Sequence, residues 1–181
     1  MKHIEYTLFE SSIGIISVVS ENDKIISLNV HTGKNIHESR KYISGLYPDG
    51  TQADDSFKTI KFLLNKYLKG EKVVFDVPLD ISRQTPFTRS VLQELLKIPH
   101  GQVRSYGWIG KQLGYSMAAR AVGQAVGRNP ILILIPCHRI IAGHGKLGGF
   151  SSGIEIKKRL LSLEGVLDRS ERIRSNLTQI L

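Results

Sequence analysis

The stretch that most restricts how this chain can fold is ILILIPCHRII, residues 131–141. Five consecutive apolar residues are typical of a strand that is buried on both faces, or of another interior segment. We expect a buried strand here, ending at Pro136. The only cysteine of the chain, Cys137, comes next, with His138 beside it. A thiol and an imidazole therefore stand where an interior segment ends.

Composition restricts the class of protein. A chain of 181 residues with 41% hydrophobic and 23% charged residues is typical of a globular protein with one large or two small domains. No apolar run approaches the ~20 residues of a membrane span, and the first residues, MKHIEY, contain no secretory h-region. A single cysteine forms no internal disulfide and no cysteine-based zinc cage. We expect a cytoplasmic monomer without metal or cofactor.

The net charge of +9 is unevenly distributed along the chain. Residues 1–83 contain 11 basic and 11 acidic side chains, whereas residues 84–181 contain 14 and 5, so the whole excess lies in the second half. Such asymmetry indicates a polyanionic partner, with nucleic acid as the first candidate. The alternative is a solvated basic surface without a partner.

The first half of the sequence predicts a small α/β (α+β) domain over residues 1–83. Alternating apolar patterns and turn residues predict three strands and two helices, and a short strand before Pro78. The strands are expected at Tyr6–Phe9, Ile13–Ser20, Ile25–Val30 and Val73–Val77, and the helices at Ile36–Leu46 and Ser56–Leu68. We find no catalytic pattern in this half.

The second half, residues 84–181, predicts a mostly helical domain. Thr85 and Pro86 have the residue types of an N-cap and first helical position, and an apolar stripe follows them. Helices are then expected at Ser105–Leu113 and from an N-cap at Ser116 to Val126, which together outline a helix-turn-helix. The last helix is expected at Ile154–Leu163, with Ser152 and Glu155 as a capping box.

The second helix of this pair, within SMAARAVGQAVG, is rich in small residues and carries one charge, Arg120. Small residues permit close approach of the helix backbone to another surface. One interpretation is tight helix–helix packing. The other is insertion into a DNA groove, because a minor groove only ~6 Å wide accepts a slim helix face.

The chemistry expected of Cys137 depends on its neighbours. A free thiol is mostly protonated at neutral pH, so a nucleophilic cysteine needs a base, and His138 is the nearest candidate. An acid would have to orient that histidine, and the second half offers Glu94, Glu155, Glu164, Asp168 and Glu171. A buried, inert cysteine and a cysteine hydrolase are the alternatives.

From about Pro86 to Gly165 the chain resembles the methylated-DNA–protein-cysteine methyltransferases, the O6-alkylguanine-DNA alkyltransferases. The resemblance rests on FTRSVLQ, PHGQVRSYG, AARAVGQA, IPCHR and LEG, which occur in the family's order. It implies a ribonuclease H-like N-terminal domain, a winged-helix-like C-terminal domain, and double-stranded DNA containing O6-alkylguanine as the partner. It also implies single-turnover transfer of the alkyl group to Cys137, with O4-alkylthymine as a further possible substrate.

The resemblance also implies site roles. Cys137 would accept the alkyl group, His138 would act as base through a water, and Glu164 would orient it. Asn129 would hold the turn before the active-site strand, and Tyr106 would stand at the flipped nucleotide and protonate the leaving guanine. Arg120 would fill the gap left by the flipped base. The other expected DNA-binding residues are Ser116, Ala119 and Gln124, and the expected pocket residues are Phe150, Ser151, Lys157, Ile140 and Val126.

One departure from the family pattern concerns the pocket, because Phe150 stands where the family often has tyrosine. Two further functions are considered. A non-catalytic alkylguanine-binding protein would lack the acceptor cysteine, which this chain has. A transcriptional regulator that senses its own alkylation would need an additional DNA-binding module, for which 181 residues leave no room.

Overall fold

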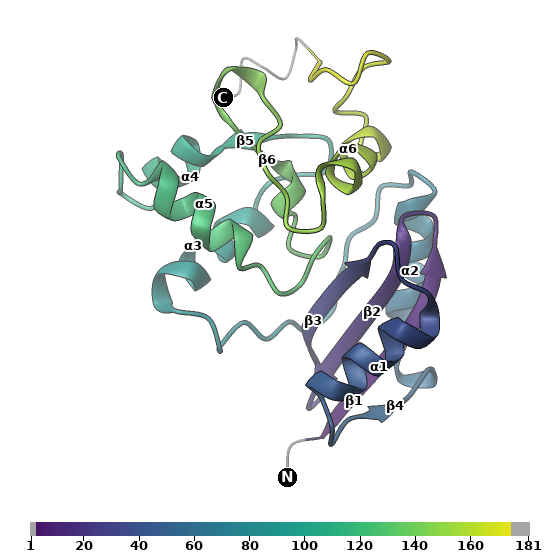
Figure 1. Ribbon diagram of the computed structural model, residues 1–181. Coiled ribbons are helices and arrows are strands. Elements are labelled where there is room, and N and C mark those ends of the chain that lie inside the picture. Colours follow the sequence, from purple (N-terminus) through teal and green to yellow (C-terminus); the bar gives the residue numbers. More distant parts are fainter. Residues whose placement is uncertain (1–2, 175–181) are drawn as a thin grey trace. The chain divides into compact units, whose positions relative to one another are not determined.

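The computed structural model describes residues 3–174, which form two compact units (Figure 1). The first unit runs to Ile81 and also includes Pro130–Leu132, and the second contains Ser82–Asn129 and the chain from Ile133 onward. The first is a sheet with helices and the second is mostly helical, which confirms the predicted fold class.

The sheet of the first unit is built from three long antiparallel strands: β1 (Ile4–Ser11), β2 (Gly14–Glu21) and β3 (Lys24–His31). A two-residue strand, β4 (Thr51–Gln52), pairs parallel with β1 and gives the order β3-β2-β1-β4. Asn22 and Asp23 join β2 to β3 with φ angles of 49° and 63°, as a tight right-twisted hairpin requires. The three strands predicted first are therefore confirmed; β1 and β3 are longer than expected, and β2 is shifted by one residue.

Two helices cover this sheet, α1 (Ile36–Leu46) in front of it and α2 (Lys58–Leu68) behind it (Figure 1). Asn35 begins α1 with a capping box to Glu38. A short 3-10 turn, η1 (Asp55–Phe57), precedes α2, so the predicted helix at Ser56–Leu68 starts later than expected. Five strand residues and Ile43 of α1 pack together in one cluster; the strand residues are Tyr6, Leu8, Ile15, Val19 and Ile26.

The strand predicted at Val73–Val77 is wrong. These residues alternate between half-buried and exposed but form no ladder, and Phe75 packs its ring on Tyr67 at 5.7 Å. The chain first pairs with the sheet at Leu79, through Ile25 of β3. Residues Pro130–Leu132, farther along the chain, also pair with this edge of β3. The backbone N–H of Leu28 donates to the carbonyl of Pro130, and the carbonyl of Leu28 accepts from the N–H of Leu132, both at 2.9 Å.

The second unit begins with α3 (Pro86–Leu96), for which Thr85 is the N-cap and Pro86 the first residue, as predicted. It continues with β5 (Arg104–Ser105), α4 (Tyr106–Gln112) and α5 (Ala119–Gly127), and the last two form the predicted helix-turn-helix. Two-residue β6 (Ile140–Ile141) pairs parallel with β5, and η3 (Gly143–Gly145) follows it. The last helix, α6 (Ile154–Leu163), has the predicted bounds.

Two predicted helix caps are wrong. The turn after α4 continues through Ala118, whose backbone N–H donates to Tyr115, so α5 begins at Ala119 and Ser116 is not its N-cap. Gly153, not Ser152, occupies the N-cap position of α6, with a φ of 93° that favours glycine. No side-chain cap forms at either place.

Candidate active site

The apolar run 131–135 is buried as predicted, but the predicted strand is wrong. Asn129, at the end of α5, donates from Nδ2 to the carbonyl of Ile135 at 2.9 Å. Six residues in a strand would span about 20 Å, so this bond requires a compact loop. The loop turns at Ile133, where φ is 70°, and then enters a 3-10 turn, η2 (Cys137–Arg139).

Cys137 is held in the protein interior at the start of η2, with 3% of its surface exposed. Its backbone N–H donates to Ile135 at 2.8 Å, and the Asn129 side chain hydrogen-bonds the thiol. Burial raises the pKa of Cys137 to about 11, although Asn129 and the charge of Lys157 act in the opposite direction. The thiol is therefore protonated at neutral pH.

His138 follows Cys137 in η2 and is fully buried. Its Nε2 is 2.9 Å from Oε1 of Glu164, the residue that ends α6. Burial lowers the pKa of His138, while the hydrogen bond and charge of Glu164 oppose that shift. Because a carboxylate only accepts, the neutral ring carries its proton on Nε2, and Nδ1 is the basic nitrogen.

The residue pattern alone left five acids open and the family resemblance implied Glu164, which is the one that reaches His138. Glu94 pairs with Lys97, and both Glu155 and Glu171 pair with Lys158. Asp168 accepts from the backbone N–H groups of Ser170 and Arg172. These acids serve local contacts at helix and turn positions.

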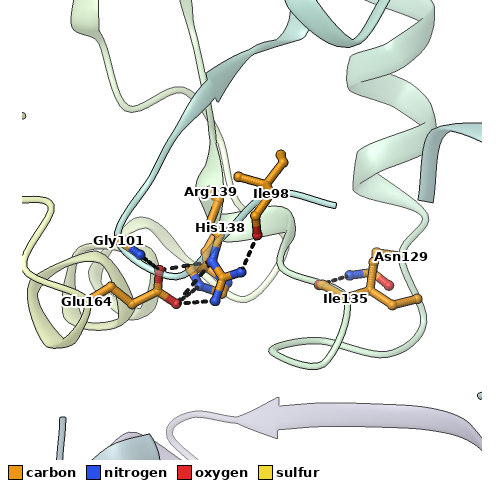
Figure 2. A network of polar contacts seen from close by, with 7 residues as sticks. All are labelled: Ile98, Gly101, Asn129, Ile135, His138, Arg139 and Glu164. Carbon is orange, nitrogen blue, oxygen red and sulfur yellow. Dashed lines mark hydrogen bonds and ion pairs between the residues drawn. The ribbon is translucent and has the colours of Figure 1, made fainter. Parts of the chain in front are cut away.

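Glu164 is the centre of a larger polar network (Figure 2). Arg139 donates to it from Nε, 2.9 Å from Oε2, and from Nη2, 2.8 Å from Oε1, and the backbone N–H of Gly101 donates to Oε2 at 3.1 Å. Burial would raise the pKa of Glu164, but its bonds to His138 and Arg139 hold it well below the usual range. The carboxylate is therefore ionised in the interior.

A cavity of about 230 Å³ opens onto Cys137. Its volume is below the ~300–1,000 Å³ of sites for drug-sized ligands, so a single flat ring system suits it. Burial raises the pKa of the Tyr106 phenol on its wall, and a negative charge on Cys137 would raise it further, so this hydroxyl keeps its proton. The full lining is Tyr106, Gly123, Val126, Gly127, Cys137, Gly149, Phe150 and Ser151.

Lys157 and Ile140, both predicted pocket residues, do not line this cavity. Ile140 is fully buried in β6. Lys157 is also fully buried, and its ammonium group donates to the carbonyls of Ile140, Leu147 and Gly149. It thereby fastens the loop before α6, which supplies the wall residues Gly149, Phe150 and Ser151, to β6.

Four of the residues predicted to contact DNA lie on the exposed side of the helix-turn-helix, whereas the fifth, Tyr106, is half-buried and lines the cavity. Ser116, Ala119, Arg120 and Gln124 are exposed, whereas Val122, Ala125 and Val126 face the interior. Gly123 of α5 faces the Tyr106 ring: a Cβ placed on Gly123 would lie 3.8 Å from ring carbons of Tyr106, which is ordinary van der Waals contact. The same short helix thus presents Arg120 outward and forms one wall of the cavity.

Sequence reasoning missed Arg139 and Gly101. The signal that could have revealed Arg139 is its charge at the edge of an apolar run. Gly101, with a φ of 78°, permits the turn that brings its N–H to Glu164, 63 residues away in the chain. Among residues 3–174, no group of three or more His, Cys, Asp or Glu side chains is arranged to hold a metal ion.

The fold and the site define a helix-turn-helix protein with a buried thiol that faces a cavity lined in part by the second helix. Two family models match the chain, the ribonuclease-like domain of 6-O-methylguanine DNA methyltransferase over residues 4–81 and its DNA-binding domain over residues 86–166. The chain belongs to the 6-O-methylguanine DNA methyltransferase family.

Its relatives are similar over most of their length. A methylated-DNA–protein-cysteine methyltransferase of Methanosarcina acetivorans is 40% identical over 88% of this chain and 97% of its own. One of Mycobacterium tuberculosis is 40% identical over 89% and 92%. A crystal structure of Mycobacterium tuberculosis OGT in complex with DNA matches with a TM-score of 0.76 and 37% identity, covering 96% of this chain and 98% of that one. Within the described residues, no helix is long and apolar enough to cross a membrane.

Proposed function

We propose that this chain repairs DNA by direct reversal, transferring the alkyl group of O6-alkylguanine to Sγ of Cys137. The observation that carries the proposal is a buried thiol that faces a base-sized cavity directly behind a helix-turn-helix. An enzyme that acts on an atom of a base must take that base out of the stack, and this cavity suits a flipped base. Family membership and the DNA complex of the Mycobacterium tuberculosis relative support DNA as the partner.

The step moves one alkyl group and one proton. The Cys137 thiol gives its proton to Nδ1 of His138, through one water, and the thiolate attacks the O6-bound alkyl carbon. An S–C bond forms while the C–O bond breaks, and its electron pair returns to the guanine. The guanine takes up a proton from the Tyr106 hydroxyl on the cavity wall, and the proton held by His138 returns through water to the Tyr106 phenolate, so that the net transfer is one proton from the thiol to the guanine. The product thioether has no good leaving group, so each molecule reacts once.

The raised pKa of Cys137 gives this mechanism a safeguard. A thiol with a pKa of about 11 contains little thiolate at neutral pH and reacts poorly with chance electrophiles. Because burial raises the pKa of Cys137, transfer of its proton to His138 has to accompany the reaction. We further propose that the chain acts as a monomer in the cytoplasm, where a reducing environment keeps the acceptor thiol free.

Intact-protein mass spectrometry after incubation with duplex DNA containing O6-methylguanine tests the function. One methyl group per active molecule is expected, mapped to the peptide containing Cys137. Cys137→Ser should bind the same DNA and gain no methyl group, because a hydroxyl is a far weaker nucleophile. Several methyl groups removed per molecule, or an adduct on another residue, would contradict the proposal. Binding without transfer by the unaltered chain would favour a non-catalytic alkylguanine-binding protein.

A further inference from the structure

Arg139 belongs to η2, the turn that also carries Cys137 and His138. Like His138, it contacts Glu164, and it does so through an ion pair. Its guanidinium lies against both carboxylate oxygens, and Nη1 donates to the carbonyl of Ile98 at 2.6 Å. The side chain is 12% exposed and that of Glu164 is fully buried. A bidentate pair in this setting has a fixed geometry.

We propose that Arg139 is a positioning residue for alkyl transfer, which fixes the Glu164 carboxylate and balances its charge so that His138 remains a neutral base. The inference rests on the proposed function and deepens it. It goes beyond the role given to Glu164 alone, because a carboxylate without Arg139 would orient His138 and also draw a proton onto it.

The physical basis is the balance of charge in a buried cluster. Oε1 of Glu164 receives both His138 Nε2, at 2.9 Å, and Arg139 Nη2, at 2.8 Å. With Arg139 present, Glu164 and the guanidinium sum to zero, and a proton added to His138 would leave a buried net charge of +1. Without Arg139, the same proton would neutralise a buried carboxylate, which is the favoured state. A histidine already protonated on both nitrogens cannot accept the proton of Cys137.

The groups that act on His138 come from every side of the turn. Glu164 and Lys157 belong to the α6 side, Arg139 follows His138 in η2, and Cys137 precedes it. From the side of α3, the backbone carbonyl of Ile98 reaches this cluster by accepting from Arg139. Burial, Arg139 and Lys157 all favour the neutral ring, while Glu164 opposes them.

The first measurement is an NMR titration of His138 in the unreacted chain, which does not depend on activity. At pH 7 the ring nitrogens should show a neutral ring protonated at Nε2, and an imidazolium would overturn the inference without any variant. Arg139→Gln should raise the titration midpoint of His138 by about one pH unit or more, because the negative charge of Glu164 is then no longer balanced by a guanidinium and stabilises the protonated ring. Arg139→Lys, which keeps the charge, should stay near the original midpoint.

Arg89 provides the matched control. It is another arginine of the same unit, and its Nη1 donates to the carbonyls of Ser82 and Gln84, at 3.0 and 3.3 Å. Arg89→Gln removes an arginine anchored on backbone but leaves the His138 cluster intact, so the midpoint should not move. An unchanged midpoint in Arg139→Gln, or an equal change in Arg89→Gln, would reduce Arg139 to a structural anchor.

The second measurement is the pH dependence of alkyl transfer from the free base O6-benzylguanine. The acid limb of the Arg139→Gln profile should move to higher pH. Below both midpoints, transfer should become about tenfold slower for each pH unit by which the midpoint rises. Above both midpoints the rates should converge. A profile that is scaled down equally at all pH values would overturn the inference. If the unaltered chain forms no adduct, the proposed function fails, while the NMR titration still judges Arg139.

Discussion

At the scale of single residues, the site is a set of buried polar groups that each have a defined partner. Glu164 accepts from His138, Arg139 and Gly101, and the Lys157 ammonium group donates to three backbone carbonyls. Such groups are costly to bury without partners. The substitutions that lower stability most should therefore be those that remove one partner of a buried polar pair and leave the other buried without it.

Glu164→Gln should lower the free energy of unfolding by about 3–5 kcal/mol, because it leaves the Arg139 guanidinium without its carboxylate in the interior. Urea unfolding followed by circular dichroism measures this. Glu94→Gln is the control, since its partner Lys97 is 67% exposed and such a pair contributes about 0–1 kcal/mol. Equal losses in the two variants would mean that the Glu164 network contributes no more than a surface pair.

Arg120→Ala should slow repair of O6-methylguanine in duplex DNA while leaving reaction with free O6-benzylguanine near the original rate. The reason is that Arg120 is exposed on α5 and is proposed to occupy the gap left by the flipped base. Unstacking costs a few kcal/mol, equivalent to about one to three orders of magnitude in rate, and only the duplex requires it. Single-turnover rates on both substrates give the comparison.

Arg128→Ala is the control for Arg120, because Arg128 is the exposed arginine at the other end of α5. Its loss should affect the duplex reaction less than the loss of Arg120. Comparable slowing of Arg120→Ala on duplex and free base would show that Arg120 supports the fold or the cavity, and the role at the flipped base would be rejected.

At the scale of elements, the helix-turn-helix depends on close approach of α4 to the turn that follows it. Gly110 of α4 is buried, and a Cβ placed on it would lie 2.7 Å from the backbone oxygen of Tyr115. This oxygen belongs to the turn that leads into α5, and it accepts from the N–H of Ala118. This close approach therefore sets the residue at which α5 begins. One side of α5 carries Arg120, and the other side lines the cavity.

Gly110→Ala should lower the free energy of unfolding by about 1–3 kcal/mol, because backbone must move to admit the added methyl group. Gly107→Ala, in the same helix, is the matched control: its Cβ would meet only the Ser105 hydroxyl, at 3.9 Å. There alanine should stabilise the helix by up to about 1 kcal/mol. Chemical unfolding of both variants gives the difference, and equal stability would mean that the α4 contact tolerates a side chain.

At the scale of the whole molecule, charge is divided between a neutral first half and a second half that carries the entire +9. Phosphate contacts release counterions, so binding to duplex DNA should weaken with salt with a log–log slope of about −0.9 per contact. The basic side chains of residues 84–181 should account for that slope, because the first half has no excess charge.

Lys111→Gln, in the last turn of α4, should reduce the magnitude of the salt slope by about 0.9, since the first helix of a helix-turn-helix crosses the DNA backbone. Lys41→Gln, on the exposed side of α1, should leave the slope unchanged. Fluorescence anisotropy with labelled duplex over a salt series measures both. A larger effect from Lys41 would contradict the division of charge.

Much of the fold could be predicted because its elements depend on neighbours in the chain. The strand pattern of β1 to β3, the Thr85 cap and the bounds of α6 all rest on residues within one or two turns of each other. Cys137 beside His138 is likewise readable from the chain itself. The predictions at Ser116 and Ser152 failed where a preceding turn, closed by Ala118 N–H to Tyr115 and by Gly153 N–H to Phe150, displaced the N-cap of the helix.

The sequence by itself determined which residue types the site contains, their order along the chain, and the charge of the half that carries them. The family resemblance implied Glu164 as the partner of His138, and the tertiary structure brings these two residues together although they are 26 positions apart. Only the tertiary structure decided that Arg139 shares that carboxylate and that Lys157 holds a loop rather than lining the cavity. It also decided that the run 131–135 is a compact loop instead of a strand. The reason is physical: apolarity drives a segment into the interior whatever its shape, whereas its conformation and polar partners follow from the elements packed around it.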